Sequence, residues 1–213
     1  MEWLDVMSNG CIFFTIVMFA TGIPQCLQMF RQKKTANIPF LPYLMTNVNN
    51  VSWIIYGQMT NNFTVLFVNV VGSSLQSIYM AVHTFYCDSK KKQVTQSLTA
   101  GLCVFVGWIV VTYGFESLSV SINITGFVCC IITILMFASP LAEINTVITE
   151  QSTARISFPL TVASFLCGGS WTLFGMLLGD SFIVVPNALG VVTSVIRFFL
   201  FHKYPSKSQV LPM

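Results

Sequence analysis

The sequence predicts an all-α polytopic membrane protein with seven transmembrane helices, arranged as two parallel three-helix repeats joined by a linker helix (3+1+3). Three observations support this fold class: the composition, the placement of positive charge and an internal repeat. Of the 213 residues, 54% are hydrophobic and 8% are charged, whereas about 25% of the residues in soluble domains are charged. So few charges cannot cover a water-soluble surface, which excludes both a soluble domain and a disordered chain.

Apolar runs long enough to cross a bilayer, about 20 residues each, occur seven times along the chain. We expect helices over residues 11–30, 40–57, 64–86, 98–114, 120–141, 158–178 and 182–201. These helices use most of the chain and leave no room for a soluble domain. The first five residues are acidic and lack a basic segment, so we expect no cleaved signal peptide.

Positive charge lies on one side of the seven predicted helices. The ten basic residues on that side are Arg31, Lys33, Lys34, Lys90, Lys91, Lys92, Arg155, Arg197, Lys203 and Lys207. The other side carries only the acids Glu2, Asp5, Glu116 and Asp180. Because positively charged loops stay in the cytosol, we expect an amino terminus that is outside or luminal and a cytosolic carboxyl terminus. The net charge of +3 is too small to indicate a nucleic-acid partner.

The sequence contains no pattern typical of metal binding or catalysis. Its seven cysteines fall mostly within apolar runs and form no Cys-x-x-Cys pair, and the two histidines are His83 and His202. We therefore expect no metal site, no disulfide framework and no cofactor. The predicted helices carry no cluster of His, Cys or carboxylate residues that would suit acid–base chemistry, so we do not expect an enzyme.

A shift of 118 residues superimposes the two halves of the chain. The pattern Ser-Trp-x3-Gly-x11-Asn-x2-Gly occurs twice without a gap, beginning at Ser52 and at Ser170. Tryptophan and intramembrane asparagine are uncommon, so the match indicates a duplication. We expect a first triple-helix repeat over residues 1–89, the linker helix and its loops over 90–117, a second repeat over 118–204 and a cytosolic tail over 205–213.

Both predicted repeats start on the outer side of the membrane. Three helices bring the chain to the inner side, and the linker helix returns it. The repeats are therefore expected to be parallel, related by an axis along the membrane normal, as in one class of transporter. Two such halves facing each other would enclose a central cavity, which favours transport over catalysis.

Several short motifs resemble the SWEET (MtN3/saliva) sugar transporters, and the resemblance covers about residues 10–204. The motifs are Leu41-Pro42-Tyr43, Tyr56-Gly57 and Pro186-Asn187. The runs Val48-Asn49-Asn50 and Phe158-Pro159-Leu160-Thr161 resemble animal members most. The resemblance implies facilitated, ion-independent diffusion of mono- or disaccharides in the plasma membrane and/or the Golgi membrane. It implies a small sugar and the lipid bilayer as partners, and it admits a homo-oligomer.

Asn69 and Asn187 are the first candidates for sugar binding. An amide in the middle of a span costs free energy unless it finds a partner, and its donors and acceptors suit sugar hydroxyls. The two residues occupy equivalent positions of the repeat, and they match the binding asparagines of the family. The alternative role is hydrogen bonding between helices.

Trp53 and Trp171 are the next candidates, because an indole can cover the apolar C–H face of a sugar ring. The alternative is a tryptophan anchored at the membrane interface. Trp171 matches a pocket residue of the family. Trp53 stands where plant relatives carry a small residue, so the resemblance implies a narrower pocket that suits a monosaccharide such as glucose.

Four prolines are candidate hinges. Pro24, Pro42, Pro140 and Pro159 are expected in the cytosolic halves of the first, second, fifth and sixth helices, where each would remove a backbone hydrogen bond and kink its helix. The resemblance implies a proline tetrad that acts as the hinges of an inner gate. The repeat offset places Pro140 on Gly22 and Pro42 on Leu160. Gly22 is therefore a further hinge candidate, and Pro42 and Pro140 are the preferred prolines.

Tyr56 and Asp180 are candidates for an outer gate. Both are expected at the external end of the cavity, where a phenol that donates to a carboxylate makes a charge-assisted hydrogen bond. The family has such a pair at matching positions. The alternative is an interfacial tyrosine and a solvated loop acid.

A uniporter for a small sugar is the leading hypothesis, because no ionisable residue lies deep in a predicted span and ion coupling usually needs one. The first alternative is a PQ-loop amino-acid exporter of a lysosome-like membrane. Pro24-Gln25 resembles its dipeptide, although the second repeat has Pro140-Leu141. The second alternative is a seven-helix receptor, which internal duplication and short loops do not favour.

Overall fold

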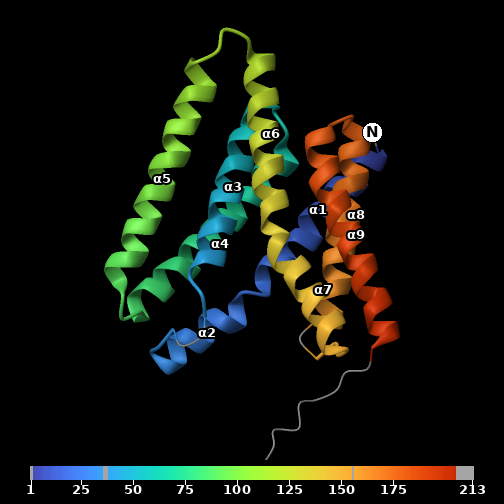
Figure 1. The fold of residues 1–213 in the computed structure, drawn as a ribbon. Helices are drawn as coiled ribbons and strands as arrows, with labels where there is room; N and C mark the ends of the chain where they lie inside the picture. Colours follow the sequence, from blue (N-terminus) through green and yellow to red (C-terminus); the bar gives the residue numbers. More distant parts are fainter. Residues whose placement is uncertain (1, 36–37, 155, 205–213) are drawn as a thin grey trace, which may run out of the picture. The chain divides into compact units, whose positions relative to one another are not determined.

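The computed structural model describes residues 2–35, 38–154 and 156–204, and every regular element in these stretches is an α-helix. In chain order the helices are α1 (Glu2–Ala20), α2 (Ile23–Gln32), α3 (Leu41–Met59), α4 (Phe63–Tyr86), α5 (Lys90–Tyr113), α6 (Leu118–Met136), α7 (Ala138–Glu150), α8 (Phe158–Leu178) and α9 (Ser181–Lys203) (Figure 1). The predicted all-α fold class is confirmed. Arg155, Lys207 and the tail at residues 205–213 lie outside the described residues.

Six helical stretches of the described chain are long and apolar enough to cross a membrane. They are Glu2–Gln32, Phe63–Tyr86, Lys90–Tyr113, Leu118–Glu150, Phe158–Leu178 and Ser181–Lys203. The seventh long helix, α3, covers the second predicted span, but its amides at Asn47, Asn49 and Asn50 lower its hydropathy. Asn47 has a partner on the neighbouring helix, since its Oδ1 accepts a hydrogen bond of 2.7 Å from the Ser73 hydroxyl.

The first and fifth predicted helices are each broken in two. α1 and α2 are separated just before Pro24, and a break at Phe137 separates α6 from α7 just before Pro140. The two prolines have no N–H to donate to the carbonyls four residues earlier, those of Ala20 and Met136, so both helical ladders are interrupted. The interruptions lie at the two prolines that were expected to kink these helices, and α7 extends the fifth predicted helix to Glu150, beyond its expected end at residue 141.

Pro42 and Pro159 do not interrupt a helix. They lie in the first turns of α3 and α8. The first N–H groups of a helix have no partner within it, so a proline there costs no hydrogen bond, and its fixed φ favours the helical conformation. The prediction of kinks at these two positions is therefore wrong, and the two prolines start their helices.

The linker helix is longer than predicted. α5 begins at Lys90 rather than at residue 98, so Lys90, Lys91 and Lys92 form its first turn. The apolar pattern could not place this start, because the added residues are polar. Lysine and glutamine are nevertheless good helix formers, and the helix continues through them.

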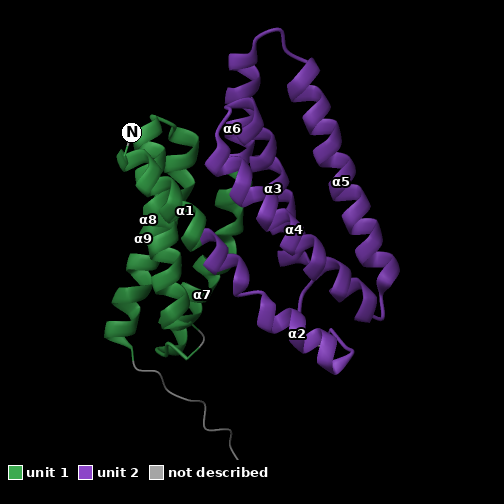
Figure 2. Cartoon of the chain, turned by 180° about the vertical axis from the view of Figure 1, so that it is seen from behind, with its two compact units in different colours: residues 1–14, 130–213 green, residues 15–129 purple. Residues whose placement is uncertain are grey.

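By packing, the chain forms two compact units, residues 15–129 and residues 1–14 with 130–213 (Figure 2). Within the first unit, α3 and α4 pack along each other, α2 packs on α4, and α5 contacts α3 and, less extensively, α4. Within the second unit, α8 and α9 pack along each other and α7 packs on α9. The same pairing of helices thus recurs in both halves of the chain.

Two equivalent glycines bring the paired helices close together. A Cβ on Gly57 would lie 3.0 Å from the backbone nitrogen of Leu66, and a Cβ on Gly175 would lie 2.9 Å from Cγ2 of Val184. Leu66 and Val184 are themselves related by the 118-residue shift. Glycine therefore permits the close approach of α3 to α4 and of α8 to α9, which fixes where the following helix can start.

Candidate functional site

Asn69 is held in one orientation on α4. The helix starts at Asn62, whose side chain accepts a hydrogen bond of 3.1 Å from the backbone of Val65. Two turns into the helix, Asn69 is 9% exposed, and its Nδ2 donates a hydrogen bond of 2.8 Å to the carbonyl of Val65. This bond uses one donor of the amide and fixes the direction of the rest of the side chain.

Asn187 repeats this arrangement on α9. Its Nδ2 donates a hydrogen bond of 2.8 Å to the carbonyl of Ile183, the residue equivalent to Val65. The side chains of Asn69 and Asn187 make no other hydrogen bond to the described residues. Each amide therefore retains a carbonyl oxygen and a second N–H for a hydroxylated ligand.

The two candidate tryptophans also share one geometry. Trp53 lies edge-on to Tyr56, with ring centroids 5.4 Å apart at 86°. Trp171 lies edge-on to Phe174, with centroids 5.7 Å apart at 87°. Both indoles are only 8% exposed, which differs from the exposure expected of an interfacial anchor. A second ring thus fixes the plane of each indole.

Asp180 begins α9. Its Oδ1 accepts hydrogen bonds of 2.9 Å and 3.3 Å from the backbone nitrogens of Phe182 and Ile183. Asn62, the equivalent residue of the first repeat, does the same for α4 with a neutral side chain. Asp180 therefore has a capping role besides the predicted gating role. Tyr56, its predicted gate partner, is 2% exposed and belongs to the other compact unit.

Gly22 lies at the break between α1 and α2, two residues before Pro24. A Cβ at Gly22 would lie 2.7 Å from Cε2 of the Tyr79 ring, so the broken segment packs closely on α4. Of the five hinge candidates, Gly22, Pro24 and Pro140 lie at the two helix breaks, whereas Pro42 and Pro159 lie at helix starts.

A polar network near the break in the first repeat was not predicted. The Tyr43 hydroxyl donates a hydrogen bond of 2.8 Å to Oε1 of Gln25, and the Tyr79 hydroxyl donates one of 3.2 Å to the carbonyl of Phe19. Tyr43 and Tyr79 form a buried cluster with Met29. The network ties α2 to α3 and the end of α1 to α4.

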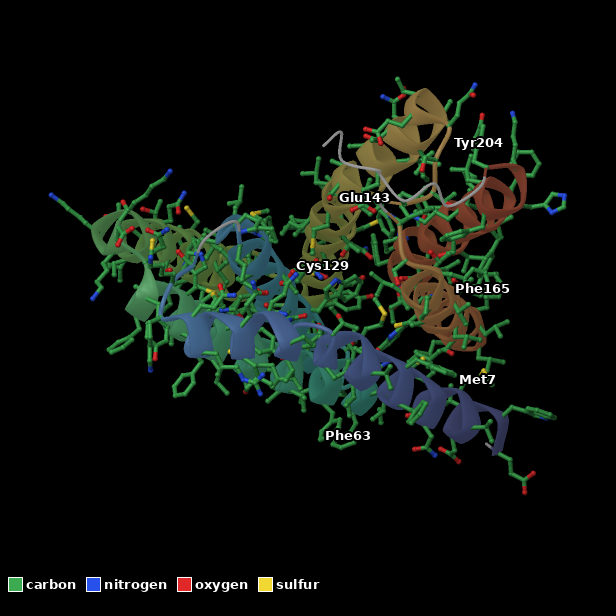
Figure 3. All side chains as sticks on the ribbon, turned by 90° about the horizontal axis from the view of Figure 1, so that it is seen from below. Met7, Phe63, Cys129, Glu143, Phe165 and Tyr204 are labelled. Atoms are coloured by element: carbon green, nitrogen blue, oxygen red, sulfur yellow. The ribbon has the colours of Figure 1, made fainter. Side chains whose placement is uncertain are left out.

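The second repeat has an ion pair in the corresponding place. Nη2 of Arg197 on α9 donates to Oε2 of Glu143 on α7 at 2.6 Å; Glu143 is labelled in Figure 3. The side chain of Arg197 is 10% exposed and that of Glu143 is 45% exposed. The 118-residue shift places Gln25 on Glu143 and Tyr79 on Arg197, so the repeat itself was the signal that could have revealed both networks.

Within the described residues, no group of three or more His, Cys, Asp or Glu side chains could hold a metal ion. The ordered features are two equivalent amides, two equivalent indoles and two helix breaks, one of each in either half. Together with the recurring helix pairing, they define a class of membrane proteins built by duplication of a triple-helix unit.

Comparison with known proteins identifies the class more closely. A family profile described as "Sugar efflux transporter for intercellular exchange" (MtN3_slv) matches residues 5–91 and again residues 123–209. The two matches start 118 residues apart, the same offset as that of the internal repeat. The chain belongs to this family, the SWEET (MtN3/saliva) family.

Among its relatives, the sugar transporter SWEET1 of Xenopus laevis is 39% identical over 211 residues, covering 96% of this chain and 95% of the relative. The human SWEET1 is 37% identical over 211 residues, with 96% and 93% covered. The solved structure of a eukaryotic SWEET transporter matches with a TM-score of 0.88 at 26% identity, covering 93% of this chain and 95% of that one. This match confirms the predicted 3+1+3 fold.

Proposed function

We propose that the protein is a facilitative, ion-independent uniporter that carries a small sugar, such as glucose, across a membrane in either direction by alternating access. The observation that carries this proposal is the pair of equivalent amides at Asn69 and Asn187. Each amide donates to the carbonyl four residues earlier in its own helix, and each keeps its side-chain oxygen and one N–H for a ligand. The chain belongs to the SWEET family, whose binding asparagines these two residues match.

The chemistry of these side chains suits a sugar. Each amide can accept from one hydroxyl and donate to another, while the faces of Trp53 and Trp171 can cover the C–H groups of the ring. Two large indoles would leave less room than one, which favours a monosaccharide over a disaccharide. We therefore assign sugar binding to these four residues.

Ion independence is supported by the pairing of the most deeply placed charges. Glu143 and Arg197 lie farther inside their helices than the other charged residues of the described chain, and they neutralise each other at 2.6 Å. Proton-coupled transporters usually need an ionisable side chain that can change its charge within the membrane. The Glu143 carboxylate is already engaged as the counter-ion of Arg197, so neither charge is left over to bind a coupling ion.

We assign the hinges to the two helix breaks, with Gly22 and Pro24 in the first repeat and Pro140 in the second. Tyr56 and Asp180 are proposed to act at the outer gate, with Asp180 keeping its helix cap. The basic residues at the end of α2, the start of α5 and the end of α9 support a cytosolic location for those helix ends. The amino terminus is then outside or luminal, and the membrane is the plasma membrane and/or the Golgi membrane.

Uptake of radiolabelled glucose into proteoliposomes tests this function. The expected result is entry of glucose until the inside and outside concentrations are equal, at the same rate with and without a pH gradient. Sucrose in place of glucose tests the proposed size limit and should enter more slowly. Accumulation of glucose above its outside concentration when a proton gradient is applied would contradict the uniporter proposal.

A further inference from the structure

An apolar groove runs between α5 and the helix pair α3 and α4, within the compact unit of residues 15–129. Its volume is about 470 Å³, which lies in the range of about 300–1,000 Å³ typical of ligand sites. The side chains that define it include Val48, Val51, Val104, Phe105 and Trp108. The groove exists because α5 contacts α3 only moderately and α4 still less.

The polar side chains that line the groove already have hydrogen-bond partners within the protein, so they do not require a polar ligand. Asn47 lines it, but the Asn47 carbonyl oxygen already accepts from Ser73 at 2.7 Å, and its Nδ2 donates to Ser77 at 3.4 Å. Ser97 donates its hydroxyl to the carbonyl of Gln93 at 2.9 Å. The remaining surface is aliphatic and aromatic, as an extended hydrocarbon chain requires.

The groove continues towards the start of α5. A second hollow of about 460 Å³ shares Met80 and Ser97 with the first and extends to Phe85 and Lys90. Nζ of Lys90 lies 5.5 Å from the centroid of the Phe85 ring, which holds the ammonium group beside the hollow. An apolar path along α5 thus ends at a cationic group.

The charge at this end of the groove is positive. Lys90, Lys91 and Lys92 follow one another in the first turn of α5, and Asp88 is the acid next to them in the chain. None of the three lysines makes an ion pair with another described residue. A hydrocarbon path that opens at unpaired cations complements one kind of molecule, which has an apolar chain and an anionic head.

We propose that this groove binds an anionic phospholipid, with an acyl chain between α3 and α5 and its phosphate at Lys90–Lys92. The inference is independent of sugar transport. Acyl chains of all lipids are equally apolar, so the selectivity comes from the lysines. Each basic residue near a membrane surface favours anionic lipid, and three of them offset by Asp88 should favour it about thirtyfold over a zwitterionic lipid.

Quenching of Trp108 fluorescence by brominated acyl chains tests the site. The full chain with Trp3→Phe, which removes an exposed indole, is reconstituted in phosphatidylcholine nanodiscs. Phosphatidylglycerol or phosphatidylcholine dibrominated near the methyl end of its acyl chains is added in small amounts, because Trp108 lies about 24 Å along α5 from Lys92. The signal of a Trp108→Phe variant is subtracted. The Trp108 signal should be half quenched at about a thirtyfold lower fraction of phosphatidylglycerol than of phosphatidylcholine, in line with the expected lipid preference.

Two pairs of variants separate the charge from the groove. Replacing Lys90, Lys91 and Lys92 together by Gln should abolish the preference, whereas Lys203→Gln at the end of α9 should preserve it. Gly101→Phe should fill the groove and protect Trp108 from both lipids, since a Cβ at Gly101 meets no atom within 4 Å. Gly107→Phe is the matched control, because a Cβ there is equally unhindered and Gly107 does not line the groove.

Equal quenching by the two lipids in the starting protein would overturn the proposal. So would a preference that survives both the triple lysine change and Gly101→Phe. If Trp108 is shielded from both lipids and light scattering gives a dimer, a second copy of the chain covers the groove and the proposal is likewise wrong. Addition of inorganic phosphate at millimolar concentration should leave the quenching unchanged, and strong competition by it would contradict binding of an intact lipid.

Discussion

The broken ends of the two repeats share one scaffold but differ in chemistry. In the first repeat, near the start of α2, Gln25 accepts a hydrogen bond of 2.8 Å from Tyr43, and Tyr79 is bonded to a backbone carbonyl. All of these groups are neutral. Their apolar surroundings are built around Met29, which is fully buried.

In the second repeat, the equivalent positions hold Glu143 and Arg197, which form an ion pair at 2.6 Å. Thr161 stands at the position equivalent to Tyr43. Its hydroxyl donates a hydrogen bond of 2.9 Å to the carbonyl of Ser157, just before its own helix. The buried apolar residue equivalent to Met29 is Val147. Neutral hydrogen bonds therefore join α2 to α3 and α1 to α4 in the first half, whereas a charged bond joins α7 to α9 in the second.

The comparison separates two kinds of position in a duplicated protein. The amides, indoles and helix starts have the same geometry in both halves, which is what two copies of one binding element require. The polar pairs beside the helix breaks differ, although their backbone positions are equivalent. We infer that the two halves offer similar groups to the ligand. The polar interactions that fix α2 and α7 beside the helix breaks should differ in strength.

Removing the charge of Glu143 should have the largest effect. Glu143→Gln leaves Arg197 buried without its counter-ion. Breaking a fully buried pair costs about 3–5 kcal/mol, and the partial exposure of Glu143 reduces this to about 2–3 kcal/mol. Thermal unfolding of the purified protein in detergent should show a clear loss of Tm.

Tyr43→Phe is the matched change in the other half. It removes one neutral hydrogen bond, which is worth about 0.5–1.5 kcal/mol. The Tm of this variant should therefore fall less than that of Glu143→Gln. An equal or larger fall for Tyr43→Phe would contradict the ranking of the two networks.

Alanine at the two equivalent glycines should give a smaller difference between the halves. A Cβ at Gly57 meets the backbone nitrogen of Leu66, which cannot move without shifting α4, whereas a Cβ at Gly175 meets side-chain methyl groups of Val184 and Ile183. Overpacking typically costs about 1–3 kcal/mol. Gly57→Ala should lie within this range and Gly175→Ala at its lower end, measured by the same unfolding experiment; the reverse order would refute this interpretation of the close contacts.

Much of the fold could be predicted from the sequence, because its signals are local and repeated. The position of α8 was predicted at both ends, and the offset of 118 residues reappears in the two family matches. Kinks near Ala20 and Phe137 were expected from Pro24 and Pro140, but complete breaks were not, since the surrounding residues are apolar and a hydropathy pattern does not distinguish a kinked helix from a broken one. A proline marks both places, but Pro42 and Pro159 show that proline alone does not indicate a break.

The candidate site could be predicted as residues but not as geometry. Equivalent positions identified Asn69 and Asn187, because an amide is costly within a membrane. The hydrogen bond from each to the carbonyl four residues earlier depends on the rotamer, which no spacing reveals. Gln25 and Glu143 were missed because a polar residue near the end of a span has no cost that would single it out.

The helix breaks should affect transport more than stability. Pro140→Ala and Pro24→Ala each restore an N–H that can bond to the carbonyl four residues earlier, which would stiffen the break. Flux of glucose in proteoliposomes should fall about threefold in each, with little loss of folded protein. Pro42→Ala is the control, because the first turn of α3 gains no such bond and its flux should stay near the starting value. Normal flux in both break variants would mean that the breaks are static.

The most direct measurement is calorimetric titration of glucose into purified protein carrying Asn69→Ala or Asn187→Ala. Each variant loses neutral hydrogen bonds worth about 0.5–1.5 kcal/mol apiece, and tenfold in affinity corresponds to about 1.4 kcal/mol. The affinity should therefore fall about threefold to tenfold, and by a similar factor in the two variants. Asn123→Ala, which changes an exposed amide on α6, should bind glucose normally. If both asparagine variants also bind glucose like the unchanged protein, then the equivalent amides do not hold the sugar.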